Sequence, residues 1–199
     1  MADWPWSWPY SPINSADFPN LIYGENTNHK RTSWATQRYN CIAWAAGEVE
    51  RPWWPQSPIN AYWPPPPAID AETLPAFISA YESRRYKVCP NASLERGFEK
   101  IAIYVDSNSV PTHAARQLRN GQWTSKVGDF PDICHEQPMD LSGPLYGNPV
   151  CYMKREHLRP TLKEIWQRLN VRRRSLSHWS LYFLKCGRAW LAGHELPFN

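Results

Sequence analysis

Length, composition and charge place the chain among globular proteins built on one domain. Its 199 residues can bury a substantial core, and its 12 tryptophans, 10 tyrosines and 20 prolines are unusually many. No apolar run approaches the roughly 20 residues that a membrane helix needs, which excludes a membrane span of that kind.

The cysteines and the first residues indicate a reducing compartment. The five cysteines form no CxxC pair, and the chain starts Met-Ala-Asp-Trp-Pro, without a basic region followed by an apolar one. We therefore expect free thiols, no secretory signal and a cytoplasmic location. Export as an effector without a cleavable signal is the alternative.

Residues 1–33 are rich in tryptophan and proline and are predicted to form an irregular arm. Each proline in Trp4-Pro5-Trp6-Ser7-Trp8-Pro9 removes a backbone donor and restricts the residue before it. The tryptophans are expected to anchor the arm on the domain surface. A platform for carbohydrate or a proline-rich ligand is the other interpretation.

A cysteine stands at the start of a helix that is predicted within residues 34–50. Asn40 is a good N-cap, and Ile42, Ala45, Ala46 and Val49 recur at helical spacing. The free N–H groups of a first turn favour negative charge and lower a thiol pKa from about 8.5. Cys41 is therefore a candidate nucleophile, or else a small buried apolar residue.

Residues 51–69 form a second tryptophan- and proline-rich segment, predicted to be extended. It holds Trp53, Trp54 and Trp63, and four prolines at 64–67 that exclude a helix or a central strand. The segment is expected either to wall a substrate groove or to wrap the core.

A packing helix follows, with Asp70 or Thr73 as its cap. Leu74, Phe77 and Tyr81 share one face, and a proline in the first turn is tolerated. We expect no chemistry from this helix.

Three short strands are predicted between residues 98 and 127. Ile101–Val105 is a continuous apolar run, and Asn120-Gly121 joins two further strand-like runs, His113–Leu118 and Gln122–Val127. The pattern predicts an antiparallel meander, with His113 at the start of its second strand.

This arrangement predicts a Cys–His site. If the helix packs on the meander, Cys41 can face His113, which would act as general base. Asp129 or Ser125 would orient the imidazole, because both follow the third strand back towards His113, and Asn108 lies farther away.

Residues 129–159 are polar and rich in turns and are predicted to form a surface loop at the sheet edge. His135 is a second candidate for proton transfer. Cys134, His135, Cys151 and His157 lack the paired spacing of zinc motifs, so no metal and no cofactor are expected.

The C-terminal part is basic and predicted to be helical. Residues 151–199 hold ten Lys or Arg against three Asp or Glu, a net +7, whereas the remainder carries −3. A solvated helix face is the favoured interpretation of this charge, and the helices over 160–199 are expected to pack on the core, with binding of a protein partner as the alternative. Binding to nucleic acid is not favoured.

The order of these motifs resembles that of the papain-like cysteine hydrolases, which include papain-type peptidases and NlpC/P60-type amidases. The matching segments are YNCIAWAAG and THAARQLRNGQWTSKVG, and with EKIAIYVDS and DICHE they also resemble a bacterial domain family of unknown function. The resemblance implies an α+β, papain-like fold in which the cysteine helix packs on an antiparallel meander. The expected domains are an arm over 1–33, a core over 34–159 and C-terminal helices over 160–199.

Two functions from different classes follow. The first is a cysteine-dependent hydrolase that cleaves an amide bond in a peptide or protein substrate, whether a peptide, an isopeptide or a cell-wall stem peptide bond, with Asn40 or Gln37 helping to bind the oxyanion. A deamidase or an acyltransferase uses the same chemistry. Gln37 is not at the offset usual in papain-type peptidases. Trp53, Trp54, Trp63 and Trp123 would line the groove. The second is a non-catalytic interaction module that uses the aromatic Trp/Pro surface and the basic C-terminal segment.

Overall fold

The computed structural model describes residues 14–56, 61–64 and 71–157. The predictions for Trp4–Pro9, for most of the 64–67 proline run and for the helices over 160–199 lie outside these residues. In the described part, no helix is both long and apolar enough to cross a bilayer.

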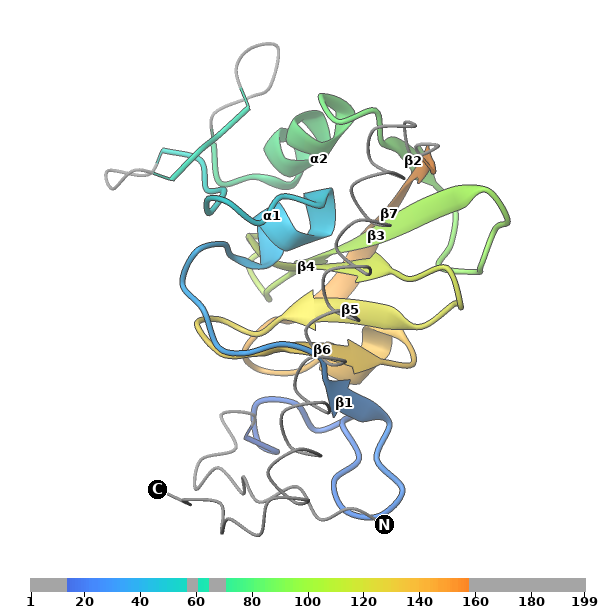
Figure 1. Cartoon of the computed structure of the whole chain (residues 1–199). Coiled ribbons are helices and arrows are strands. Elements are labelled where there is room, and N and C mark those ends of the chain that lie inside the picture. The colour runs from blue at the N-terminus through green and yellow to red at the C-terminus, as the bar shows by residue number, and fades with distance from the viewer. Residues whose placement is uncertain (1–13, 57–60, 65–70, 158–199) are drawn as a thin grey trace, which may run out of the picture. The chain divides into compact units, whose positions relative to one another are not determined.

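One antiparallel sheet organises the described residues. Its strands run in the order β1-β6-β5-β4-β3-β7-β2, so that β1 and β2 form the two edges (Figure 1). Every neighbouring pair is antiparallel. The strands are β1 (His29–Arg31), β2 (Lys87–Cys89), β3 (Phe98–Val105), β4 (Pro111–Gln117), β5 (Trp123–Lys126), β6 (Asp132–His135) and β7 (Asn148–Glu156).

The predicted fold class was wrong. The described residues form a seven-stranded sheet with two α-helices, α1 (Cys41–Ala46) and α2 (Leu74–Glu82), and a 3-10 turn, η1 (Pro138–Leu141). This is a β-rich fold rather than a papain-like α+β fold. The sheet is larger than predicted because residues 129–159, interpreted as a surface loop, contain β6, η1 and β7.

Several local elements agree with the sequence prediction. Helix α1 begins at Cys41, and the Asn40 side chain accepts a hydrogen bond from the Ala43 backbone. The helix ends at Ala46, before the expected Val49, because Gly47 adopts a left-handed conformation with φ 83° and closes it. The Asn120-Gly121 turn joins β4 and β5 as expected.

The two faces of the sheet bury different clusters. The first face, here called the helix face, packs against α1 and α2 through residues that include Ile101, Ile103 and Ala114. The second, here called the arm face, carries Ala102, Tyr104 and Ala115. Residues alternate between faces along a strand, so neighbours in β3 and β4 belong to different clusters.

The arm face is covered by the chain that precedes β1. Phe18 and Leu21 are almost fully buried and share a cluster with Trp123, Ile133 and Leu141. Part of the predicted arm therefore supplies core side chains. Apolar burial on both faces explains why the strands show little polar alternation.

Candidate functional site

Cys41 lies at the start of α1 on the helix face. Its side chain is 9% exposed and shares a cluster with Ile42 and Ala114. The Sγ–H group points at the Thr112 carbonyl oxygen, 4.0 Å away. The thiol is therefore held against β4 and is covered by apolar side chains.

Burial controls the protonation of this thiol. Desolvation raises the pKa of Cys41 to about 11, because a buried thiolate loses its hydration. Backbone N–H groups of Ala114, Ile42 and Cys41, and the charge of Lys126, act in the opposite direction but do not offset burial. Cys41 is a neutral thiol at pH 7, the reverse of the lowered pKa expected from its position in the helix.

His113 lies on the arm face. It pairs with Tyr104 across β3 and β4 and is fully buried. Its ring stacks on Tyr146, with centroids 4.0 Å apart and planes at 8°, and meets Tyr104 edge-on at 5.1 Å. Neither ring nitrogen has a hydrogen-bond partner. Burial, with a smaller contribution from His135, holds the pKa of His113 well below its usual value.

The predicted Cys–His pair is therefore not assembled in this structure. His113 and Ala114 are consecutive residues of β4, so their side chains point to opposite faces, and Ala114 is the one beside Cys41. The imidazole and the thiol are separated by the sheet itself. A general base must come within hydrogen-bond reach of the proton that it removes, and His113 does not.

Replacing His113 by phenylalanine is expected to raise the free energy of unfolding by about 1–3 kcal/mol, because it removes two buried polar atoms that have no partner. The ring contacts with Tyr104 and Tyr146 would be kept. Urea unfolding at pH 7 followed by circular dichroism measures the change. As a control, His113→Ala should destabilise the fold, since it leaves a cavity between two tyrosines. A destabilised phenylalanine variant would contradict this account.

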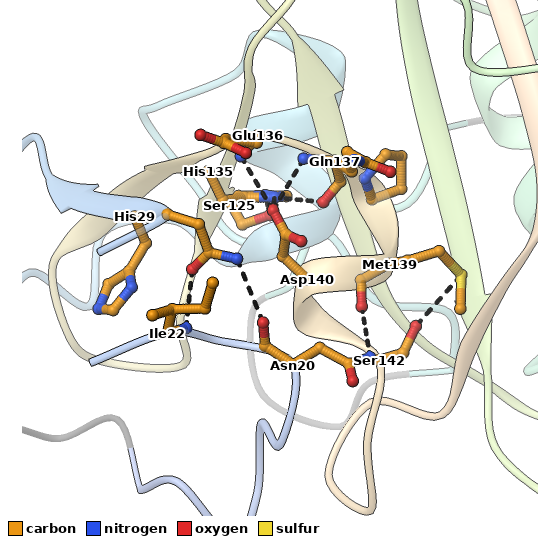
Figure 2. Close-up of polar contacts among 12 residues, drawn as sticks. Asn20, Ile22, His29, Ser125, His135, Glu136, Gln137, Met139, Asp140 and Ser142 are labelled. Carbon is orange, nitrogen blue, oxygen red and sulfur yellow. Dashed lines mark hydrogen bonds and ion pairs between the residues drawn. The ribbon is translucent and has the colours of Figure 1, made fainter. Parts of the chain in front are cut away.

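Ser125 and His135 form a hydrogen bond with each other, and neither forms one with the His113 ring. Ser125 Oγ lies 3.0 Å from His135 Nε2, and His135 Nδ1 lies 2.8 Å from the Gln137 carbonyl (Figure 2). The carbonyl can only accept, so Nδ1 carries the proton and Nε2 accepts from the serine hydroxyl. Both side chains are fully buried. Burial lowers the pKa of His135 to about 4.

Of the three remaining polar candidates, two contact each other. Gln37 Nε2 donates to Asp129 Oδ2 at 2.9 Å, in an exposed position. The Asn40 side chain caps α1 and also binds the Trp53 backbone, donating to its carbonyl at 2.7 Å and accepting from its N–H at 3.1 Å. These contacts give Asn40 a structural role that connects α1 to the loop.

The tryptophans of the predicted groove pack into the core. Trp53 is fully buried beside Tyr81, and Trp123 is 2% exposed on the arm face. Trp54 and Trp63 are half-buried, and both rings contact Phe77. Residues 51–56 and 61–64 therefore pack on the helix side of the domain, as in the alternative interpretation of this segment.

The sequence reasoning missed a polar cluster on the helix face, here called the Lys126 cluster: Lys126, Asp132 and Tyr39. Tyr39 Oη donates to Asp132 Oδ2 at 2.8 Å, and Lys126 Nζ lies 5.7 Å from the centre of the Tyr39 ring and donates to the Phe130 carbonyl. Asp132 Oδ1 is buried without a partner. Burial lowers the pKa of Lys126 and raises that of Asp132. Lys126 and Asp132 are direct partners of β5 and β6, a non-local pairing that the sequence alone did not reveal.

Two exposed aromatic residues lie beside this cluster. Trp34 is 76% exposed and Phe130 is 46% exposed. Trp34 follows Ser33, whose Oγ accepts from the Asp132 N–H at 2.9 Å, and the Phe130 carbonyl accepts from Lys126 Nζ, so both residues adjoin the cluster. We call these two residues the Trp34–Phe130 patch.

Among the described residues, no three side chains of metal-binding type are grouped closely enough to hold an ion. The described residues thus form a β-rich domain with a largely buried thiol and an exposed aromatic patch. Residues 30–154 match the family described as Domain of unknown function (DUF7689), and the chain belongs to this family. No curated protein and no solved structure matches the chain.

Proposed function

We propose that this domain is a non-catalytic interaction module. The observation that supports the proposal is the separation of Cys41 from His113 by the sheet, with each side chain buried in a different cluster. A cysteine hydrolase needs a thiolate beside a base and access for substrate. Neither the raised pKa of Cys41 nor the enclosed ring of His113 meets that need.

The surface best suited to a partner is the Trp34–Phe130 patch. Large exposed aromatic side chains supply much contact area at low entropic cost and are enriched at interfaces. Gln37 and Asp129 are exposed and add hydrogen-bonding groups near the patch, whereas Lys126 and Asp132 are buried. The partner is a protein segment that offers apolar side chains flanked by polar groups. The basic C-terminal segment lies outside the described residues and plays no part in this proposal.

Selection from a displayed peptide library tests the proposal. Peptides recovered on the full chain should lose at least about tenfold in affinity for the double variant Trp34→Ser, Phe130→Ser, since each aromatic hot spot contributes more than about 1 kcal/mol. Val88 and Leu94 are also exposed, so Val88→Ser, Leu94→Ser is the matched control and should bind normally. Equal loss in both double variants, or no selectable peptide, would count against the patch.

A cysteine-dependent amidase is the second candidate, and one observation favours it. Lys126 lies on the same face as Cys41, and its charge lowers the pKa of that thiol. In this candidate mechanism the charge of Lys126, and not the imidazole of His113, would favour the Cys41 thiolate. A thiol that reacts readily at neutral pH would favour the amidase, and a protected thiol favours the interaction module.

A further inference from the structure

Two histidines occupy opposite positions on β1 and β6, where the chain before the sheet joins the sheet. His29 of β1 pairs directly with His135 of β6, so both side chains lie on the arm face. β1 is an edge strand of three residues. The segment before it is held by the buried side chains of Phe18 and Leu21, and by Asn20 Nδ2, which donates to the Met139 carbonyl at 2.9 Å (Figure 2).

The contacts of His135 suit its neutral form. Nδ1–H donates to the Gln137 carbonyl and Nε2 accepts from Ser125, in a site with no exposure. His29 Nδ1 is also buried and has no partner. Adding a proton to His135 therefore places a charge among groups arranged for uncharged imidazole, and a proton on the half-buried His29 adds a second positive charge that acts on the first.

The titratable groups around the two histidines would compensate only part of the positive charge that protonation adds. Asp140 Oδ2 lies 4.0 Å from His135 Nδ1, but it already accepts the Glu136 and Gln137 N–H groups at 3.0 and 2.8 Å. Glu136 itself is exposed. From the other elements, His113 of β4 and Tyr104 of β3 face this region, and Tyr23 contacts the His29 ring. Two imidazolium groups would therefore share one carboxylate that is already engaged.

We propose that the His29–His135 pair is an acid-sensitive latch, which holds segment 14–31 on the arm face while both rings are neutral and releases it when they are protonated. Release would open the edge of β6 and uncover the apolar residues that Phe18 and Leu21 cover. The inference does not depend on the proposed function.

The direction with pH follows from proton linkage. A histidine whose pKa is lowered in the closed state binds protons better when open, so acid favours opening below its ordinary pKa of about 6.5. With the pKa of His135 at about 4 in the closed state, the opening constant should rise about 30-fold between pH 7.5 and pH 5. Burial lowers the pKa of His29 as well, which adds to the effect.

Hydrogen–deuterium exchange of the full chain tests the latch. Labelling times at pH 5.0 and 7.5 are scaled for the intrinsic exchange rate, and peptides from 14–31 are compared with peptides from β3 and β4. We expect opening of segment 14–31 to increase about 30-fold at pH 5 while β3 and β4 stay protected. A similar response along the whole chain, or none in 14–31, would overturn the proposal.

Matched variants assign the effect to the pair. His135→Gln and His29→Gln keep a polar side chain without the titration, and each should reduce the acid response of 14–31. His157→Gln, outside the pair, should leave the response unchanged. If His135→Gln does not fold, His29→Gln and the ring titration of His135 followed by NMR in the unmodified chain decide the question. An unchanged acid response in His29→Gln, or a His135 ring that titrates near pH 6.5 with the segment closed, would refute the latch.

Discussion

Gly147→Ala should destabilise the domain by about 4 kcal/mol or more, the largest effect expected from a single methyl group in the described residues. A Cβ at this position would stand 1.8 Å from the Val105 carbonyl oxygen and 2.8 Å from Asp106 Cα. Gly147 also has a φ of +66°, which costs an L-residue roughly 1–2 kcal/mol. Because the clash is with backbone at the end of β3, it cannot be relieved by rotating a side chain.

The same glycine also holds the Tyr146 ring in place over His113. Gly147 and Gly143 exchange two backbone hydrogen bonds of 2.7 and 3.0 Å, and the Tyr146 carbonyl between them accepts from Thr112 Oγ1 at 2.6 Å. This turn holds the Tyr146 ring on His113. Displacing it would expose the imidazole as well as weaken the end of β3.

Gly128→Ala is the matched control for the glycine prediction. Gly128 has a φ of +51°, but an added Cβ there meets nothing within 4 Å. It should cost only the conformational part, about 1 kcal/mol. Urea unfolding midpoints of the two variants, measured by circular dichroism, give the difference. Equal destabilisation would show that the contact at Val105 is not tight.

Sequence signals that depend on neighbouring residues predicted the start of α1 and the β4–β5 turn correctly. Asn40 before Cys41 identified the first residue of α1, because the capping hydrogen bond to Ala43 is local. Asn120-Gly121 identified the β4–β5 turn for the same reason. Both depend on residues within a few positions of each other, so the sequence contains all that is needed.

The number of strands in the sheet could not be predicted from local signals of this kind. β6 is a four-residue strand in a polar segment, and Lys154 and Arg155 in β7 interrupt any apolar run. These strands exist because β3 and β5 are available to pair with them, which is a non-local property. The predicted α+β class failed because it followed the papain-like resemblance and assigned strands only between residues 98 and 127, whereas the sheet has seven strands.

The sequence did not predict which face of the sheet His113 occupies, because side chains alternate between faces with a period of two residues. His113, Ala114 and Ala115 are all buried, so hydrophobicity does not tell which of them faces α1. A shift of one residue moves every side chain to the other face. The order of the motifs predicted that Cys41 lies against β4, and Cys41 does lie beside Thr112 and Ala114 of that strand. It did not predict that the His113 side chain points to the other face.

Alkylation of Cys41 in the folded chain should be about 300-fold slower at pH 7.5 than that of an ordinary cysteine. The reactive species is the thiolate, and a pKa of about 11 in place of about 8.5 lowers its fraction by that factor. The 9% exposure of the side chain slows access further. Quenched iodoacetamide labelling followed by mass spectrometry of the Cys41 peptide measures the rate across pH 6–10.

The same peptide labelled in urea is the internal control, because unfolding removes both the burial and the pKa shift. There Cys41 should react as a free thiol, and the ratio of the two rates gives the protection of this one residue. Lys126→Met should slow the folded reaction further, since the charge that favours the thiolate is lost. Rapid labelling below pH 7 in the folded chain would mean that the thiol is ionised and accessible. That result would replace the interaction module with the amidase.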